Sequence, residues 1–286
     1  ATGAKQIKLL GLSGTYVQML TENVPNLRGA SLPYSLGYVS GPWMQSIQVS
    51  KGASSVKNGY ESTTGQINIE FLKPQGTDGL RANVYQDSEL KTEVNLDGSI
   101  HLTDRLSTST LLHFENRQTD HDGNDDSFMD MPKLRQYNVM HRWAYVSPRW
   151  ISQLMLRGLH DEREGGQSRK HADIFSSEPL YSTSVKTNRY EMQWKNGFTL
   201  NADHNTSVAL MLHGSWHDAE NQFGLTRYDV TQKNGYAQLM FETDINANNN
   251  ISVGASLNYD RYDERFNPLG TKPNPETSVT GETTPG

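Results

Sequence analysis

Strict alternation of apolar and polar residues, repeated from about residue 80 onward, is the feature that most constrains the fold. In residues 189–195, Tyr190, Met192 and Trp194 alternate with charged or amide side chains. Successive side chains of a β-strand point to opposite faces, whereas a helix would scatter these apolar residues around its circumference. The alternation predicts nine strands, at roughly 80–87, 90–102, 106–117, 136–146, 150–160, 187–200, 206–217, 235–244 and 250–259.

The predicted connections alternate between tight turns and long polar segments. The tight turns are at 103–105, 147–149, 201–205 and 245–249, and the long segments are at 118–135, 161–186 and 218–234. Short turns on one rim and long loops on the other are the layout of an outer-membrane β-barrel. The predicted strands also exceed the length of about 5–6 residues that is usual in soluble sheets. A soluble antiparallel sandwich or barrel, which alternates in the same way, is the competing interpretation.

Composition at first suggests a soluble protein. The net charge is −6 and the mean hydropathy is −0.70. Adding the 24 glycines to the hydrophobic fraction and leaving out the 13 tyrosines gives about 38% apolar residues, below the roughly 45–50% of ordinary domains. Half-apolar strands around a polar lumen produce the same figures. The short apolar runs predict no membrane-spanning helix.

Several classes of function lack support in the sequence. The absence of cysteine excludes disulfides, thiolate metal sites and thiol nucleophiles. The acidic balance argues against a nucleic-acid partner. No nucleophile–base pair, phosphate-binding loop or zinc-protease motif occurs, so we expect no enzyme. The first residues contain no apolar secretory segment, which indicates a mature chain or an internal fragment.

The residues before about 79 have a different character, with dense and irregular glycines that indicate a compact α/β segment. Residues 46–69 read SIQVSKGASSVKNGYESTTGQINI. This segment resembles the plug signature of TonB-dependent outer-membrane transporters, in which a strand ending in Lys-Gly leads through a glycine turn to a strand ending in Gly-x-Ile-Asn. Gly52, Gly59 and Gly65 would permit the positive φ angles of a tightly folded plug. Residues 11–14 and 41–43 resemble the form common in Bacteroidetes members.

The resemblance implies a fold, a function and partners. The fold would be an antiparallel up-and-down membrane β-barrel with an N-terminal α/β plug: residues 1–78 would be the C-terminal part of the plug, and 79–286 the first nine or so barrel strands. The function would be TonB-dependent import of a scarce nutrient, such as a ferric siderophore, cobalamin or another metal complex, across the outer membrane of a Gram-negative bacterium. The expected partners are the TonB–ExbB–ExbD complex, outer-membrane lipid, the substrate and a surface lipoprotein. A β-rich surface or soluble binding module without transport is the alternative.

The resemblance also predicts that this sequence is a piece of a longer protein. Barrels of the family have 22 strands, and the TonB box would lie before residue 1. A barrel of eight or nine strands encloses only side chains or one small ligand. Such a barrel could not hold a plug of nearly eighty residues.

Candidate substrate contacts follow from position relative to the plug signature. Arg28 would pair with anionic groups of a substrate, and Tyr34, Tyr38 and Trp43 would offer flat contact surfaces. The alternative for the aromatic residues is that they pack the plug against the barrel wall. Charged residues on the lumen face are expected to hydrogen-bond the plug; they are Glu115, Arg117, Arg142, Arg157, Arg189 and Glu191.

No cofactor is expected, apart from a calcium ion in one extracellular loop. Asp120, Asp122, Asn124 and Asp126 place oxygen ligands at alternate positions, as the start of a calcium loop does. The rest of the EF-hand pattern is missing, and a solvated acidic loop is the alternative. Calcium orders such loops in cobalamin transporters of the family. His213 and His217 would lie about 13 Å apart on one strand, too far to share a metal, and are expected to be lumen polar residues.

Overall fold

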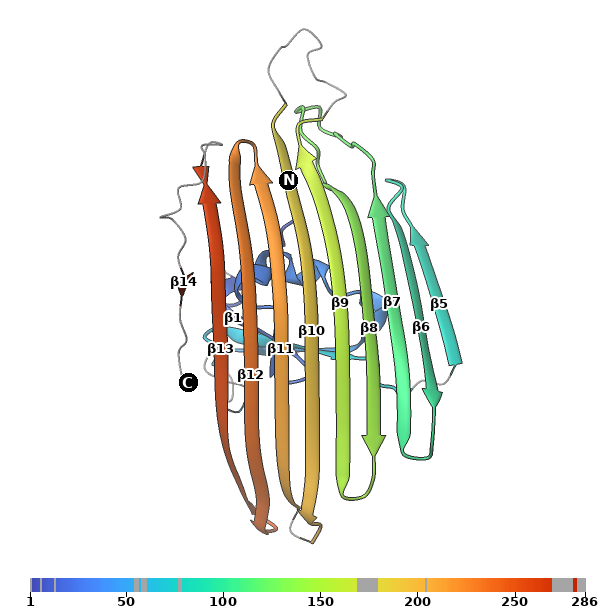
Figure 1. Ribbon diagram of the computed structural model, residues 1–286, viewed down its shortest axis with the longest axis vertical. Coiled ribbons are helices and arrows are strands. Elements are labelled where there is room, and N and C mark those ends of the chain that lie inside the picture. Colours follow the sequence, from blue (N-terminus) through green and yellow to red (C-terminus); the bar gives the residue numbers. More distant parts are fainter. Residues whose placement is uncertain are drawn as a thin grey trace.

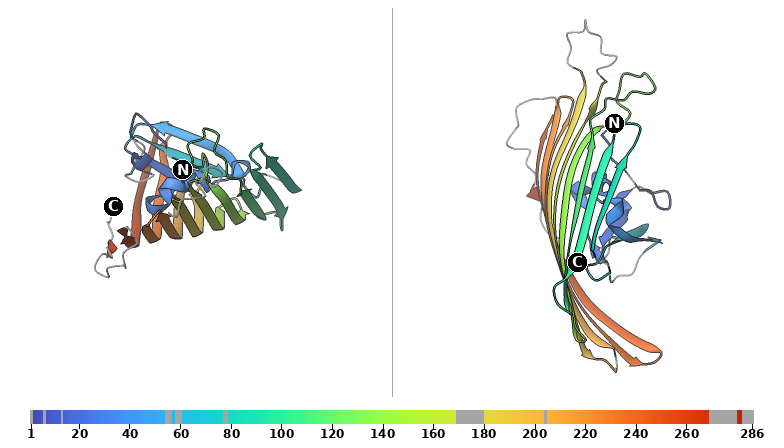
Figure 2. Two further views of the ribbon diagram at one scale, coloured as in Figure 1. Left: turned by 90° about the horizontal axis from the view of Figure 1, so that it is seen from above. Right: turned by 90° about the vertical axis from the view of Figure 1, so that its right-hand side faces the viewer.

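The computed structural model describes residues 2–5, 7–12, 14–53, 57, 61–76, 79–168, 180–203, 205–268 and 280–281. It consists of a small N-terminal unit and one long curved sheet (Figure 1). We call the described residues up to 76 the plug and the long sheet the wall. The plug lies against one face of the wall (Figure 2), which we call the inner face. The predicted boundary at 78 and 79 adjoins residues 77 and 78, which lie outside the described residues.

The wall is an antiparallel sheet in which each strand pairs with the next along the chain. Its strands are β5 (Gly79–Gln86), β6 (Thr92–His101), β7 (Leu106–Arg117), β8 (Lys133–Val146), β9 (Trp150–Gly166), β10 (Ser182–Asn201), β11 (Thr206–Phe223), β12 (Thr226–Asn246), β13 (Asn249–Asn267) and the short β14 (Thr280–Gly281). The nine predicted strands correspond in order to β5 through β13, and the two-residue β14 was not predicted.

One predicted connection is wrong. Residues 218–234 do not form a long loop, because β11 and β12 continue to Phe223 and from Thr226 and leave a two-residue turn. Gly224 has φ +60° in this turn. The extension has polar residues on both faces, so hydrophobic alternation did not reveal it. Its pairing is stabilised by backbone hydrogen bonds and by contacts such as Thr231 Oγ1 to Asp218 at 2.6 Å.

The plug contains short strands and 3-10 helices: η1 (Gly14–Tyr16), β1 (Val17–Thr21), β2 (Val24–Pro25), η2 (Gly29–Gly37), η3 (Gly41–Trp43), β3 (Met44–Lys51) and β4 (Gly65–Phe71). The strand order is β2-β1-β4-β3, with β1 parallel to β4. The two strands of the signature, β3 and β4, pair antiparallel. Among the described residues, no helix is long and apolar enough to cross a membrane.

Two signature glycines have the backbone angles that the sequence predicts. Gly52 has φ +88° and Gly65 has φ +152°. A Cβ atom at Gly65 would lie 2.3 Å from the carbonyl oxygen of Ser50, so no other residue fits without moving the backbone. Gly59 lies outside the described residues.

The two faces of the wall are inverted relative to a soluble protein. On β10, Tyr190 is 57% exposed and Met192 is 46% exposed on the outer face. Between them on the inner face, Glu191 is only 5% exposed. Apolar residues outside and polar residues inside are the arrangement of a transmembrane barrel, whereas a sandwich would bury the apolar face. The structure therefore favours the membrane barrel over the soluble alternative.

Aromatic residues form two belts on the outer face. Towards the short turns, ring centroids are 4.8 Å apart for Tyr145–Trp150 and 5.9 Å for Trp150–Phe198. Towards the long connections, they are 5.2 Å apart for Phe114–Tyr137 and 5.6 Å for Tyr190–Trp216. The two belts are about eight residues apart along a strand, or roughly 26 Å at strand rise. This spacing, reduced by strand tilt, suits an apolar band about 25 Å tall.

Replacing Leu212 by Arg tests the membrane-facing assignment. Leu212 pairs with Trp194 between the belts, so we expect the charge to lower the free energy of unfolding by about 2–4 kcal/mol. Ser184→Arg, on the outer face of β10 beyond the belts, is the control and should change it by less than about 1 kcal/mol. The measurement is urea unfolding of the full-length protein in lipid vesicles. Equal effects of the two variants would contradict the assignment.

Candidate functional site: the contact between plug and wall

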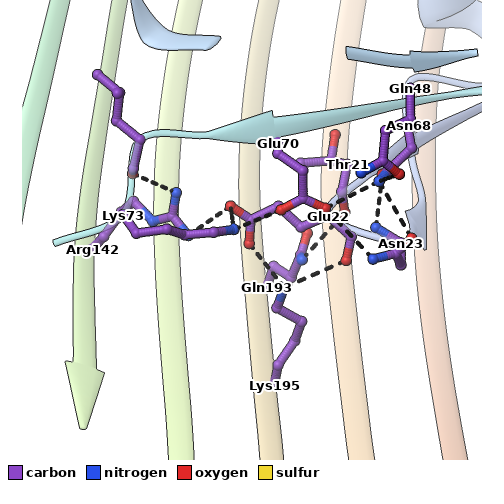
Figure 3. Close-up of polar contacts among 11 residues, drawn as sticks. Thr21, Glu22, Asn23, Gln48, Asn68, Glu70, Lys73, Arg142, Gln193 and Lys195 are labelled. Atoms are coloured by element: carbon purple, nitrogen blue, oxygen red, sulfur yellow. Dashed lines mark hydrogen bonds and ion pairs between the residues drawn. The ribbon is translucent and has the colours of Figure 1, made fainter. Parts of the chain in front are cut away.

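The contact between plug and wall centres on one buried carboxylate, Glu22 (Figure 3). It follows β1 and is 2% exposed. Its oxygens lie 2.6 Å from Nζ of Lys73, 2.7 Å from Nη2 of Arg142 and 2.9 Å from Nζ of Lys195. Burial by itself raises the pKa of Glu22, but the charges of Arg142, Lys195 and Lys73 outweigh burial and hold that pKa well below its usual range. Glu22 is thus an ionised link between one plug cation and two wall cations.

The turn that presents Glu22 is shaped by the signature motif. Glu22 and Asn23 both have positive φ, at 52° and 65°, as a tight turn between antiparallel strands requires. Asn68, the last residue of Gly-x-Ile-Asn, accepts a hydrogen bond from the Asn23 backbone N–H at 2.8 Å. The Glu22 N–H donates to the carbonyl oxygen of Ile69 at 2.9 Å. The motif therefore holds the turn in the conformation that directs Glu22 toward the wall.

A second group of contacts surrounds Tyr38. The guanidinium of Arg157 donates to the Tyr38 carbonyl oxygen and to Glu191, the latter at 3.3 Å. The Tyr38 hydroxyl donates to Thr187 Oγ1 at 3.3 Å. Burial, together with the charge of Asp161, raises the pKa of Tyr38. The ring and its backbone are thus bound to the wall from both sides.

The aromatic residues predicted to contact substrate are buried in this structure. Tyr38 and Trp43 have no exposed area, and Tyr34 is 9% exposed. The guanidinium of Arg157 lies 5.9 Å from the Trp43 ring centroid, and that of Arg163 lies 5.0 Å from the Tyr34 centroid. These two cation–π contacts and the hydrogen bond from Tyr38 to Thr187 place the three rings between the plug and the inner face of the wall. A role in substrate binding stays a prediction.

Arg28 joins one carboxylate of the plug to one of the wall. It pairs with Glu61 and, at 3.0 Å, with Asp260 on β13. Its side chain is 21% exposed. Burial raises the pKa of Glu61, with Arg28 opposing the rise and Asp260 adding to it. Arg28 therefore already has two anionic partners where the sequence predicts a substrate anion.

A polar cavity of about 180 Å³ lies between the plug and the wall near the long-connection end. Plug residues 36–41 form one side of it, and residues of β6, β7, β9 and the loop before β8 form the other. Its charged lining consists of Lys5, Lys91, Glu93, Glu115, Arg117 and Arg163. Four cations against two carboxylates give the lining an excess of positive charge. An anionic group would be favoured in this cavity.

The predicted calcium loop folds through its own backbone. Asp122 accepts hydrogen bonds from the backbone N–H groups of Asp126 at 3.2 Å and Ser127 at 2.9 Å. Asn124 also accepts from Asp126, at 3.3 Å, and Asp120 has a polar contact of its own. No group of three or more acidic or histidine side chains within the described residues is arranged to hold a metal ion. Calcium binding stays a prediction.

The predicted hydrogen bonds from lumen charges to the plug are found for three arginines. Arg142 donates to the Leu72 carbonyl oxygen at 2.8 Å, Arg189 donates to Asn26 at 2.8 Å, and Arg157 bonds Tyr38. The other members of that set contact the wall or its loops: Arg117 bonds Pro132, Glu115 pairs with Lys91, and Glu191 pairs with Arg157 and Arg189. His213 and His217 are buried on the inner face of β11.

Glu22, Lys73 and Lys195 are the contacts that sequence reasoning missed. Lys195 stands on the polar face of an alternating strand, so its inward direction was predictable. Glu22 lies in a short polar turn, where an acidic residue usually faces solvent. Only the meeting of plug and wall reveals its three partners.

No family model matches this chain, and no curated protein matches it. It is similar to several solved structures. They include the ferripyoverdine receptor of the outer membrane of Pseudomonas aeruginosa, with 12% identity and a TM-score of 0.69 over 94% of this chain and 41% of the receptor. The siderophore receptor PiuA from Acinetobacter baumannii has 11% identity and a TM-score of 0.70 over 99% of this chain and 43% of PiuA. The copper transporter OprC has 12% identity and a TM-score of 0.74 over 99% of this chain and 44% of OprC.

These similarities show the fold. The chain shares the plug and antiparallel barrel wall of outer-membrane receptors of Gram-negative bacteria, and it spans less than half the length of these three proteins. These neighbours are transport receptors and not enzymes. The predicted fold class of a membrane β-barrel with an N-terminal plug is confirmed.

Replacing Glu22 by Gln tests the central ion-pair group. We expect the plug to be destabilised against the wall by about 3–5 kcal/mol, because three cations would lose their buried counter-charge. The chain has no cysteine, so a single cysteine introduced in the plug reports the exposure of the plug by its labelling rate, once any cysteine of the full-length protein outside this chain has been replaced. Glu70→Gln is the control: Glu70 also pairs with Lys73, but its side chain is 18% exposed. The assignment is wrong if both variants label at the same rate.

The lowered pKa of Glu22 predicts that acid weakens the contact between plug and wall. A carboxyl group whose pKa is lowered in the folded state stabilises that state at pH values above the ordinary carboxyl pKa. This stabilisation is lost as the pH falls through the lowered pKa. We therefore expect plug labelling to rise more steeply with acid in the wild-type protein than in Glu22→Gln. Parallel pH profiles would show that Glu22 does not couple protons to plug contact.

The contribution of Glu61 to stability should depend on pH in the opposite direction. Because the folded state raises its pKa, its contribution is complete below the ordinary carboxyl pKa of 4.5 and is lost as the pH rises towards the raised value. In urea unfolding, the free energy of unfolding should fall less for Glu61→Gln than for the wild type as the pH rises above 4.5. Identical slopes in the two proteins would contradict this expectation.

Proposed function

We propose that this chain is part of a TonB-dependent outer-membrane transporter that imports a scarce nutrient as a metal complex, such as a ferric siderophore or cobalamin. One observation carries the proposal: a wall with an apolar outer face binds a separate plug on its polar inner face. A passive porin would keep its lumen open to water. A plug in the lumen requires an energy-consuming step to clear a path.

The unpaired edges of the wall support its place in a larger barrel. All eight residues of β5, at one edge, are exposed, and β3 of the plug is exposed from Gln45 to Lys51. Backbone groups without partners are costly in hydrocarbon, so open sheet edges do not face lipid. More strands would pair these edges and enclose the far side of the plug. We infer that the 22-stranded barrel of the family supplies them.

The geometry suggests how transport would proceed. Substrate would bind at the long-connection end, where the lining of the polar cavity has excess positive charge and where Arg28 would exchange Glu61 and Asp260 for an anionic group of the substrate. An anionic metal complex suits these cations. Tyr34, Tyr38 and Trp43, being buried, would hold the plug loops that form this end.

Release of the plug would require force. The TonB–ExbB–ExbD complex would pull the plug and separate Glu22 from Arg142 and Lys195. No bond of the substrate changes. A surface lipoprotein covering the long connections, and calcium in the loop with Asp122, remain proposals of the same kind.

Uptake by cells tests the proposal. The full-length protein is expressed in a Gram-negative host that lacks its own receptors, with and without a functional TonB. Because the solved neighbours include ferripyoverdine and copper receptors, labelled ferric siderophores, copper and cyanocobalamin are supplied separately. We expect uptake of one class, and only when TonB is present. Uptake without TonB would indicate a passive channel, and detergent-free monomers without uptake would indicate a binding module.

A further inference from the structure

One buried arginine of the wall, Arg117, has no carboxylate partner within the described residues. It is 8% exposed, and its Nε and Nη2 atoms donate to the carbonyl oxygen of Pro132 at 3.2 and 2.6 Å. The other buried arginines of the described chain each pair with a carboxylate: Arg142 with Glu22, Arg157 and Arg189 with Glu191, and Arg163 with Asp161. A buried charge without a counter-charge is strongly destabilising. The surroundings of Arg117 therefore lack an anion.

The guanidinium of Arg117 also retains free hydrogen-bond donors. Its Nε–H and one N–H of Nη2 are directed at Pro132. The N–H groups of Nη1 and the second N–H of Nη2 have no partner in the part of the chain that the structure describes. The edge between Nη1 and Nη2 presents two parallel donors, an arrangement that binds two oxygens of one carboxylate or phosphate. Arg117 lines the polar cavity between plug and wall.

The two carboxylates that line this cavity are bound to other groups. Glu115 lies 2.9 Å from Nζ of Lys91 and 3.6 Å from Nε2 of His113. Glu93 pairs with the same lysine. Lys91 thus joins both carboxylates, and neither of them neutralises Arg117.

The plug contributes a second cation that has no anionic partner. Lys5 lines the cavity from the plug side, is exposed, and makes no ion pair or side-chain hydrogen bond within the described ranges. Arg163, also in the lining, pairs with Asp161 and donates to the carbonyl oxygen of Gly3 at 3.1 Å. An anion between Lys5 and Arg117 would meet one unneutralised cation from each side of the cavity.

The size of the cavity limits which anion it can hold. Its volume of about 180 Å³ is below the roughly 300–1,000 Å³ of pockets that enclose a drug-sized ligand. A phosphate group fits this space, whereas a whole metal complex does not. The free edge of Arg117 would occupy both oxygens of a carboxylate. A phosphate group has further oxygens for Lys5, and its charge of nearly −2 balances the two cations.

We propose that this cavity binds one phosphate group, held by Arg117 of the wall and Lys5 of the plug. The group is inorganic phosphate or the phosphate end of a larger solute. The bound anion would supply the counter-charge that Arg117 lacks, and it would add a link between plug and wall. The proposal rests on the proposed function in one respect, the assignment of the long-connection end to the substrate.

Anion binding to the full-length protein tests this site. Protein in detergent and phosphate-free buffer is titrated with labelled inorganic phosphate or glycerol 3-phosphate, and the bound anion is measured by equilibrium dialysis. We expect Arg117→Gln to weaken phosphate binding about tenfold. Arg117→Lys should weaken it less, because it keeps the charge and loses only the parallel donors. Equal binding of the two probes would support a larger solute as the occupant, and preference for inorganic phosphate would support the free anion.

Urea unfolding distinguishes loss of the site from loss of the fold. Without phosphate, Arg117→Gln should be at least as stable as the wild type, because it removes an uncompensated buried charge and glutamine keeps a donor for Pro132. Phosphate should raise the urea midpoint of the wild type, since it binds the folded state, and should leave the variant unchanged.

Lys133→Gln is the matched control. Lys133 precedes Leu134, the cross-strand partner of Arg117, and points to the opposite face of β8. The proposal is overturned if this variant weakens binding as much as Arg117→Gln, or if Arg117→Gln is less stable than the wild type without phosphate. It is also overturned if neither probe binds the wild type, as expected if the rest of the protein supplies a carboxylate to Arg117. Import is not the readout, so failed binding leaves the proposed transport untouched, and failed uptake leaves this test valid.

Discussion

The wall has hydrocarbon on its outer face and a polar lumen on its inner face, and this difference determines the rest of the structure. Hydrocarbon on one side requires paired backbone groups and apolar side chains. Because strand side chains alternate, this requirement leaves the opposite set free to be polar, and Arg189, Glu191 and Gln193 form such a set on β10. The inner face also carries a few buried apolar residues, such as Met140 and Leu159, which pack in one cluster with plug residues such as Trp43. Hydrogen bonds and ion pairs complete the attachment of the plug.

The ion pairs between plug and wall affect how the plug can be released. The polar part of the attachment comes from separate groups, around Glu22, Tyr38 and Arg28, in each of which opposite charges meet. Buried ion pairs are strong against loss of one partner, yet contribute little when both partners regain water. A plug attached in this way stays in place at rest and can leave when water enters behind it.

Much of the wall was predictable, and less of the site was. Nine strands, their order and their apolar faces followed from alternation, because a bilayer imposes a period of two. The upper parts of β11 and β12 were missed, since both faces carry polar residues there and the alternation of apolar and polar residues disappears. Asn68 was recognisable as part of a motif, but its support of the Glu22 turn was not. Pairing between residues distant in the chain leaves no periodic trace.

The sequence by itself determined the class of structure: alternating strands with one apolar face, and a glycine-rich segment that resembles a plug. Both depend on local physics, strand geometry and backbone freedom at glycine. Only the tertiary structure decided which charges meet. Glu22 and Arg142 are separated by most of the plug and three wall strands in the chain. Charge balance depends on distances in space, and folding sets those distances.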